Sequence, residues 1–183
     1  MKHYNVVING TSPLLFNKPA ELGFDKTFVE KMASPDHDAE MLQRFYTDKN
    51  MNICTPGIHI ERSLIAAGKK LRVKGAGKAT YSKIFGSMLS VSPDLIIHQF
   101  QEYTVHKSLV VIPSTKGRIL RCRPMLERWQ LDFTVSVEEE DISDEVVKEA
   151  LKIAGKFCGI GDWRPEKAGK FGKFETISFK EIR

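Results

Sequence analysis

The 183-residue sequence lacks the features of exported and membrane-bound proteins. Its 3 cysteines, Cys54, Cys122 and Cys158, are odd in number, far apart and never in a CxxC spacing. This pattern predicts neither a disulfide framework nor a zinc site. No apolar run approaches the roughly 18 residues of a membrane span, and no apolar signal-peptide stretch follows Met1. These absences predict a protein of the reducing cytoplasm without a membrane partner.

Motifs of the common enzyme classes are missing as well. The 5 histidines show no HxxxH, HxH or HExxH spacing, and the sequence contains no Gly-x-Ser-x-Gly or Walker motif. Lys74 to Thr80 contains Gly-Lys-x-Thr, but the first glycine of a phosphate-binding loop is not at its offset. The acidic run 138–141 is typical of a solvated segment before a helix start. The sequence therefore predicts no cofactor, no metal and no enzymatic activity.

Acidic residues are scarce in the middle of the chain. Residues 51–128 hold 13 Lys or Arg against 4 Asp or Glu, whereas residues 1–50 hold 6 against 7 and residues 129–183 hold 9 against 12. The stretch 69–83 carries 6 cations and no acid. Concentrated positive charge favours a polyanion bound with a steep salt dependence. A solvated basic face, or one that meets an acidic protein surface, is the alternative.

A glycine-rich segment precedes the C-terminal strand. Residues 159–174 combine 4 glycines and 4 cations with Trp163 and Phe171. Glycine lets the backbone approach a ligand closely, and Trp, Phe and Arg stack on nucleic-acid bases. An ordinary turn whose aromatic rings cap the core is the alternative. We interpret the segment as a binding loop that is not part of the hydrophobic core.

The hydrophobic periodicity predicts an α+β protein. Strands are expected over 4–8, 129–137 and 174–179, buried strands near 95–97 and 109–112, and helices over 58–68 and 144–154. Thr55 and Ser143 are the expected N-caps, and Gly155 the expected C-cap glycine. This order contains the β-α-β-β-α-β skeleton of a ferredoxin-like or RRM-like sandwich. We expect a single domain over 1–183 with insertions at 17–50 and 69–93.

Two motifs resemble the RAMP superfamily, the backbone and processing subunits of CRISPR effector complexes. Thr55 to Leu64 resembles the family's helix entry IPGSSLKGALR, and Gly159 to Lys173 resembles its C-terminal glycine-rich loop. The resemblance implies a RAMP-like fold and an RNA-binding or single-stranded-nucleic-acid-binding subunit that forms homo-oligomers or joins a larger complex. RAMP processing subunits use a histidine as general acid or base. A metal-independent ribonuclease using His98 or His106 is therefore the minority hypothesis.

Two further segments are similar to small phage and prophage proteins that have no settled function. These are Gly10 to Leu15 and Gly159 to Glu166. This similarity leaves open a phage structural or interaction protein, either a virion component or an inhibitor that imitates a subunit of a host defence complex.

The main hypothesis is non-catalytic binding of single-stranded RNA or DNA, with RNA favoured. Cations of the basic third would hold phosphates, and the glycine-rich segment would stack on bases. The predicted residues of the basic third are Lys69, Lys70, Arg72, Lys74, Lys78, Lys83, Arg118, Arg121 and Arg123. Those of the glycine-rich segment are Trp163, Arg164, Lys167, Lys170, Phe171 and Lys173.

Overall fold

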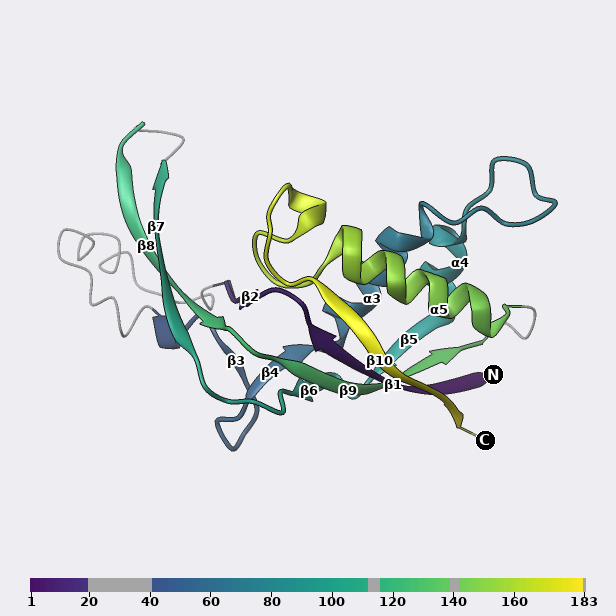
Figure 1. Cartoon of the computed structure of the whole chain (residues 1–183), viewed down its shortest axis with the longest axis horizontal. Helices are drawn as coiled ribbons and strands as arrows, with labels where there is room; N and C mark the ends of the chain where they lie inside the picture. The colour runs from purple at the N-terminus through teal and green to yellow at the C-terminus, as the bar shows by residue number, and fades with distance from the viewer. Residues whose placement is uncertain (20–40, 112–115, 139–141, 183) are drawn as a thin grey trace.

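The computed structural model describes residues 1–19, 41–111, 116–138 and 142–182. Its centre is a four-stranded antiparallel sheet of order β10-β1-β9-β5. Two helices, α3 (Gly57–Gly68) and α5 (Asp144–Ile153), lie across one face of this sheet (Figure 1). The strands are β1 (Lys2–Gly10), β5 (Leu89–Ser92), β9 (Gln130–Val137) and β10 (Phe174–Ile182). None of the described helices is long and apolar enough to cross a bilayer.

Alternation of side chains explains how this sheet is built. β1 buries Tyr4, Val6 and Ile8, and β9 buries its apolar residues at the same period of two, which directs both sets toward the helices. Polar side chains occupy the other face, where Asn5 donates a hydrogen bond of 2.8 Å to Asp132. RRM proteins stack bases on aromatic residues of that face. The described strands present no Phe, Tyr or Trp there, so they lack the aromatic residues that RRM proteins carry on this face.

The helices bury the stripes that the sequence predicts. Helix α3 (Gly57–Gly68) buries Ile60, Leu64 and Ala67, and helix α5 (Asp144–Ile153) buries Val147 and Ala150. The order β1-α3-β5-β9-α5-β10 is the ferredoxin-like β-α-β-β-α-β arrangement. The α+β class and the skeleton are therefore confirmed.

The second strand of the skeleton differs from the prediction. It is β5, which follows helix α4 (Tyr81–Met88) and lies inside the stretch 69–93 that we expected to be an insertion. β5 has only four residues and alternates Leu and Val with Ser. This pattern is too short to distinguish a strand from the end of the preceding helix. Of the expected insertion 17–50, residues 20–40 lie outside the described residues.

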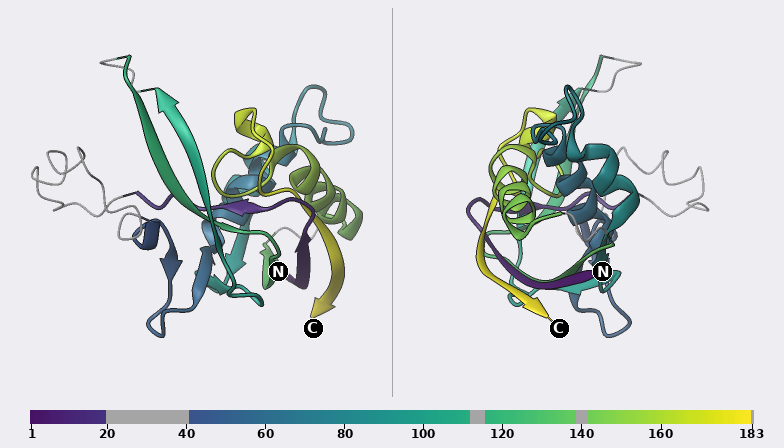
Figure 2. Two further views of the ribbon diagram at one scale, coloured as in Figure 1. Left: turned by 60° about the vertical axis from the view of Figure 1, so that its left-hand side comes forward. Right: turned by 90° about the vertical axis from the view of Figure 1, so that its right-hand side faces the viewer.

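Residues 95–97 and 109–111 belong to two smaller sheets. β6 (Leu95–Ile97) pairs with β4 (Ile53–Pro56), which pairs with β3 (Tyr46–Thr47). β7 (Thr104–Val111) and β8 (Arg118–Leu126) form a long arm to which β2 (Leu14–Leu15) adds a short third strand. The arm extends away from the helices (Figures 1 and 2).

The prediction of two buried strands holds for Ile96 of β6, which is 1% exposed, but not for its neighbours or for the arm. Leu109 and Val111 on the arm are exposed, and so are Leu95 and Ile97 on β6, while residue 112 lies outside the described part. A continuous apolar run is consistent with a buried strand, but it cannot show whether a second layer covers that strand.

Two predicted helix caps are also corrected. Pro56 is the N-cap of α3, and the Thr55 hydroxyl instead forms a 2.8 Å hydrogen bond with His98 Nε2. Gly155 lies inside η2 (Ala154–Cys158), a π-helical continuation of α5, and not at a C-cap. A Cβ at Gly155 would collide with the carbonyl oxygen of Phe174. Close packing of η2 on β10 is therefore what this glycine permits.

Candidate nucleic-acid interface

Three segments that carry predicted residues project on the helix-covered side of the sheet. They are the loop between α3 and α4, the glycine-rich loop and the β7–β8 arm, and the glycine-rich loop lies between the other two (Figures 1 and 2). The predicted cations therefore do not form one track along neighbouring elements. Those of the basic third lie in two regions at opposite ends of the molecule, around the loop between α3 and α4 and on the arm, and those of the glycine-rich loop lie between them (Figure 1).

The loop between α3 and α4 is a two-stranded ribbon that holds lysines in solvent. The Tyr81 amide donates to the Leu71 carbonyl at 3.0 Å, and the Val73 amide donates to Ala79 at the same distance. At the tip, Gly75 and Gly77 have positive φ angles of 77° and 61° and open space around them. The predicted cations of this region are all exposed: Lys69, Lys70, Arg72, Lys74, Lys78 and Lys83.

The predicted arginines of the arm differ in how far their side chains are exposed to solvent. Arg118 is exposed near the end of β8, and Arg121 is half-buried. Arg123 Nε forms an ion pair with Asp162 Oδ2 at 3.0 Å, its guanidinium lies 5.5 Å from the Trp163 ring centroid, and its side chain is only 14% exposed. Arg123 therefore joins the arm to the glycine-rich loop.

The glycine-rich loop packs against the core, whereas we predicted a binding loop that is not part of the core. The Ile160 amide donates to the Gly172 carbonyl at 3.0 Å, and the Gly172 amide donates to Pro13 at 2.8 Å. Phe171 is only 4% exposed, with its ring centroid 5.2 Å from that of His106. The predicted stacking of bases on Phe171 is wrong, because this ring is part of the packing between loop and arm.

Trp163 remains available at the surface of the same loop. Its side chain is 40% exposed, and its ring is stacked against Phe171 at a centroid distance of 6.3 Å. It has a positive φ of 46°, and its carbonyl accepts a hydrogen bond of 3.0 Å from the Phe171 amide. Lys167 and Lys170 are exposed nearby in the loop, and Lys173 is half-buried. A half-exposed indole held in place by packing is suited to base stacking.

Phe157 is an exposed aromatic residue that the sequence analysis missed. It lies in η2, is 57% exposed, and has Lys70 Nζ 5.4 Å from its ring centroid. Its neighbour Cys158 is buried. Neighbouring residues of a helix point in different directions, so Cys158, four residues after the buried Ala154, faces the core while Phe157 faces solvent.

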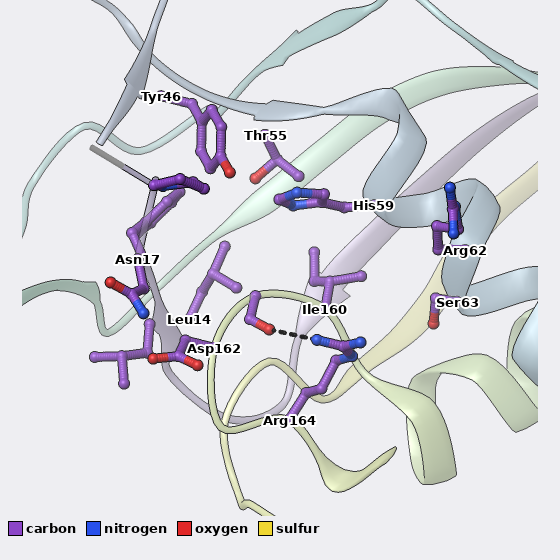
Figure 3. A pocket seen from close by; sticks show the side chains of 14 residues that line it. Leu14, Asn17, Tyr46, Thr55, His59, Arg62, Ser63, Ile160, Asp162 and Arg164 are labelled. Carbon is purple, nitrogen blue, oxygen red and sulfur yellow. Dashed lines mark hydrogen bonds between the residues drawn. The ribbon is translucent and has the colours of Figure 1, made fainter. Parts of the chain in front are cut away.

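A cavity of about 310 Å³ lies between the start of α3, the segment around β2 and the glycine-rich loop (Figure 3). Helix α3 contributes His59, Arg62 and Ser63, which are three and four residues apart and so share a helix face. That spacing was the available signal, but only Arg164 of this cavity was predicted. The other lining residues are Leu14, Leu15, Phe16, Asn17, Pro19, Tyr46, Thr55, Ile160, Gly161 and Asp162.

Charges at the cavity are unevenly compensated. Arg164 donates from Nε and Nη2 to Glu166 Oε2, at 3.0 and 2.8 Å, and from Nη1 to the Gly161 carbonyl at 3.2 Å. These contacts involve η3 (Pro165–Lys167) and neutralise the charge of Arg164. Arg62 is exposed and has no carboxylate partner among the described residues. Burial, and then the charge of Arg164, lower the pKa of His59, which favours its neutral imidazole.

The two histidines of the ribonuclease hypothesis serve in packing. His98 is 2% exposed, and burial lowers its pKa to about 3. A histidine held neutral and shielded from solvent is a poor general acid or base near neutral pH. His106 packs edge-on against Trp163 and Phe171, and burial followed by the charges of Arg123 and Lys170 lowers its pKa. Over the described residues, no three His, Cys, Asp or Glu side chains gather as a metal site requires.

Comparison with known proteins identifies the fold but no sequence family. No family model matches the sequence, and no curated protein matches it. A chain of the Type III-B Cmr-beta complex bound to cognate target RNA aligns with a TM-score of 0.56 and 10% sequence identity. The alignment covers 98% of this chain and 61% of that chain, so the protein spans less than two thirds of that neighbour's length. A chain of a Type IV-B CRISPR complex aligns with a TM-score of 0.49 and 12% identity over 97% of this chain and 90% of that one.

The Cmr-beta neighbour agrees with the topology described above. The protein has a ferredoxin-like α+β fold, and the similarity to the Cmr-beta chain supports this assignment of the fold. The similarity to phage proteins receives no support from the comparisons.

Proposed function

We propose that the protein binds single-stranded nucleic acid, RNA in preference to DNA, as a non-catalytic subunit of a larger complex. The observation that carries the proposal is the position of the half-exposed Trp163 on a loop between two basic elements. Exposed cations attract phosphates without reading sequence, and a fixed aromatic ring stacks on any base. The RAMP-type fold supports this reading, because the Cmr-beta neighbour is a chain of a complex bound to target RNA.

Single strands are favoured over duplexes by the geometry of the aromatic residue. A ring that protrudes from a loop meets the face of a base only where the base is not stacked inside a helix. The glycine-rich loop, which carries Trp163, and the loop at residues 72–80 between α3 and α4, which carries Lys74 and Lys78, lie on the same side of the molecule (Figure 2). This arrangement would let one strand reach both. Assembly with further copies or other subunits would extend this surface.

Fluorescence anisotropy of labelled single-stranded RNA, single-stranded DNA and duplex DNA tests the proposal. We expect salt-dependent binding that is tightest for single-stranded RNA. Trp163→Ala should lose about 1–3 kcal/mol of binding free energy through lost stacking. Ile177→Ala, at an exposed apolar position of β10, is the control for a change of surface hydrophobicity. Failure of all three nucleic acids to bind at low salt would refute the proposal.

The same fold similarity favours one competing function. A protein that shares the fold of a complex subunit could take that subunit's place and dock on the complex without holding nucleic acid itself. Its basic face would then meet an acidic protein surface. Purification distinguishes the two, because a nucleic-acid-binding subunit should retain nucleic acid at low salt and show a raised 260/280 nm absorbance ratio, which a docking protein would not.

A further inference from the structure

We infer that the cavity between α3 and the glycine-rich loop receives one nucleotide of the bound strand, with its phosphate beside Arg62 and Ser63 (Figure 3). This inference rests on the proposed function and names a site for it that is separate from the Trp163 surface. The cavity volume of about 310 Å³ is at the lower end of the range for small-molecule sites, which fits a ligand the size of one nucleotide.

The hydroxyl of Ser63 is the first observation that points to a ligand. Ser63 is only 3% exposed, and its Oγ has no hydrogen-bond partner among the described atoms, although it lines the cavity. A buried hydroxyl without a partner is costly, so native structures usually satisfy it. Figure 3 shows this hydroxyl on the side of the cavity toward Arg164. A bound phosphate oxygen would accept the missing hydrogen bond.

The arginines supply the charge that such a phosphate requires. Arg62 lines the cavity and is exposed, and it lacks a described carboxylate partner. Arg164 uses three of its five N–H groups on Glu166 and Gly161, which leaves two donors. Because Glu166 compensates Arg164, the net positive charge comes from Arg62. One net charge suits a single phosphate better than a polyanion running through the cavity.

The remaining walls suit a base and a sugar. Leu14, Leu15 and Ile160 give an apolar surface, and the ring of Tyr46 meets the edge of His59 at a centroid distance of 5.3 Å. A neutral imidazole can both donate and accept a hydrogen bond, as recognition of a base edge requires. Gly161 brings the loop backbone against Leu14, where a Cβ would lie 2.6 Å from Leu14 Cδ1. The wall opposite α3 is thus held in place by packing.

Binding of nucleoside monophosphates to the purified full-length protein tests this inference. The probes are AMP, GMP, CMP and UMP, with adenosine and inorganic phosphate as comparisons, measured by calorimetry and by protein NMR. We expect at least one monophosphate to bind about tenfold more tightly than adenosine or phosphate alone, since each of those makes only part of the contacts. Ser63→Ala should weaken that binding about tenfold, and Arg62→Gln should do the same.

Thermal unfolding separates this role from a structural one. Ser63→Ala removes a hydroxyl that makes no hydrogen bond, so its unfolding midpoint should equal or exceed that of the wild type. The matched controls are Ser87→Ala, at an exposed position of α4, and Arg128→Gln, at an exposed position after β8, and both should leave monophosphate binding unchanged. If Ser63→Ala proves unstable, the exposed Arg62→Gln decides the question alone.

The outcomes also distinguish this inference from the proposed function. A wild-type protein that binds single-stranded RNA but no monophosphate, or variants that bind monophosphate like the wild type, would overturn the cavity assignment and leave the proposed function intact. Binding of monophosphates in the cavity without any binding of RNA strands would refute the proposed function instead.

Discussion

Phe157 is exposed in a position that folding does not explain. Its ring is 57% exposed beside Lys70, and the neighbouring Lys69 and Lys156 are exposed too. A large apolar ring in a cationic surface loses hydrophobic stabilisation without a partner, but it gains stacking energy when a base covers it. We therefore expect Phe157 to act as a second stacking residue in addition to Trp163.

Replacement of Phe157 by leucine tests this role. Phe157→Leu keeps an apolar side chain but removes the ring, so it should lower affinity for single-stranded RNA by about 1–3 kcal/mol. The free energy of unfolding should change little, because the ring is mostly exposed. Anisotropy and urea unfolding measure the two effects, and Phe157→Trp should restore binding. Equal affinity of Phe157→Leu and wild type would show that the ring has no such role.

At the scale of elements, the arm and the glycine-rich loop form one unit. The Arg123–Asp162 ion pair and the contacts of His106 with Trp163 and Phe171 connect β7 and β8 to the loop. The 72–80 loop differs, because its hydrogen bonds lie within the ribbon itself and open space surrounds its glycines. We expect the arm to position Trp163 and the 72–80 loop to supply charge.

Neutralising the tip of the 72–80 loop should change the salt dependence of binding. Lys74→Gln together with Lys78→Gln removes two phosphate contacts, so the slope of log K against log salt should fall by about 1.4 for a single strand. Affinity should decrease for all sequences alike, because phosphate contacts carry no base preference. Anisotropy across a salt series measures the slope. The control is Lys148→Gln with Lys152→Gln on α5, and an unchanged slope in the loop variant would contradict the assignment.

At the scale of the whole molecule, buried histidines make stability depend on pH. His98 titrates near pH 6.5 when unfolded but only at about pH 3 when folded, so the unfolded state binds more protons between these values. Stability should therefore fall as the pH drops below about 6.5, by up to about 1.4 kcal/mol per pH unit from His98. Burial lowers the pKa of His59 and His106 as well, so both act in the same direction.

Urea unfolding between pH 7 and pH 5 measures this dependence. His98→Gln should reduce the slope of unfolding free energy against pH, even if the variant is less stable at pH 7, because it removes one titrating group. An identical slope in wild type and His98→Gln would show that His98 is not held neutral in the fold.

The elements with long periodic patterns could be predicted from the sequence, whereas the residues of the candidate site could be predicted only in part. Strand β9 alternates over eight residues, and α5 carries its stripe through Val147, Ala150 and Leu151, so both are set by local pattern. The positive charge of residues 69–83 could also be read from the sequence. The cavity could not be predicted, because His59, Arg62 and Ser63 line a cavity only where the folded glycine-rich loop faces them.

The sequence by itself determined the α+β class, the long strands β1, β9 and β10 with helices α3 and α5, and the excess of positive charge, because periodicity and charge are properties of contiguous residues. Only the tertiary structure decided that Phe171 is buried while Phe157 is exposed. Tertiary structure likewise decided that Arg123 pairs with Asp162 and that β5 completes the central sheet. The physical reason is that these outcomes depend on strand register and on contacts between residues far apart in the chain, neither of which leaves a local pattern.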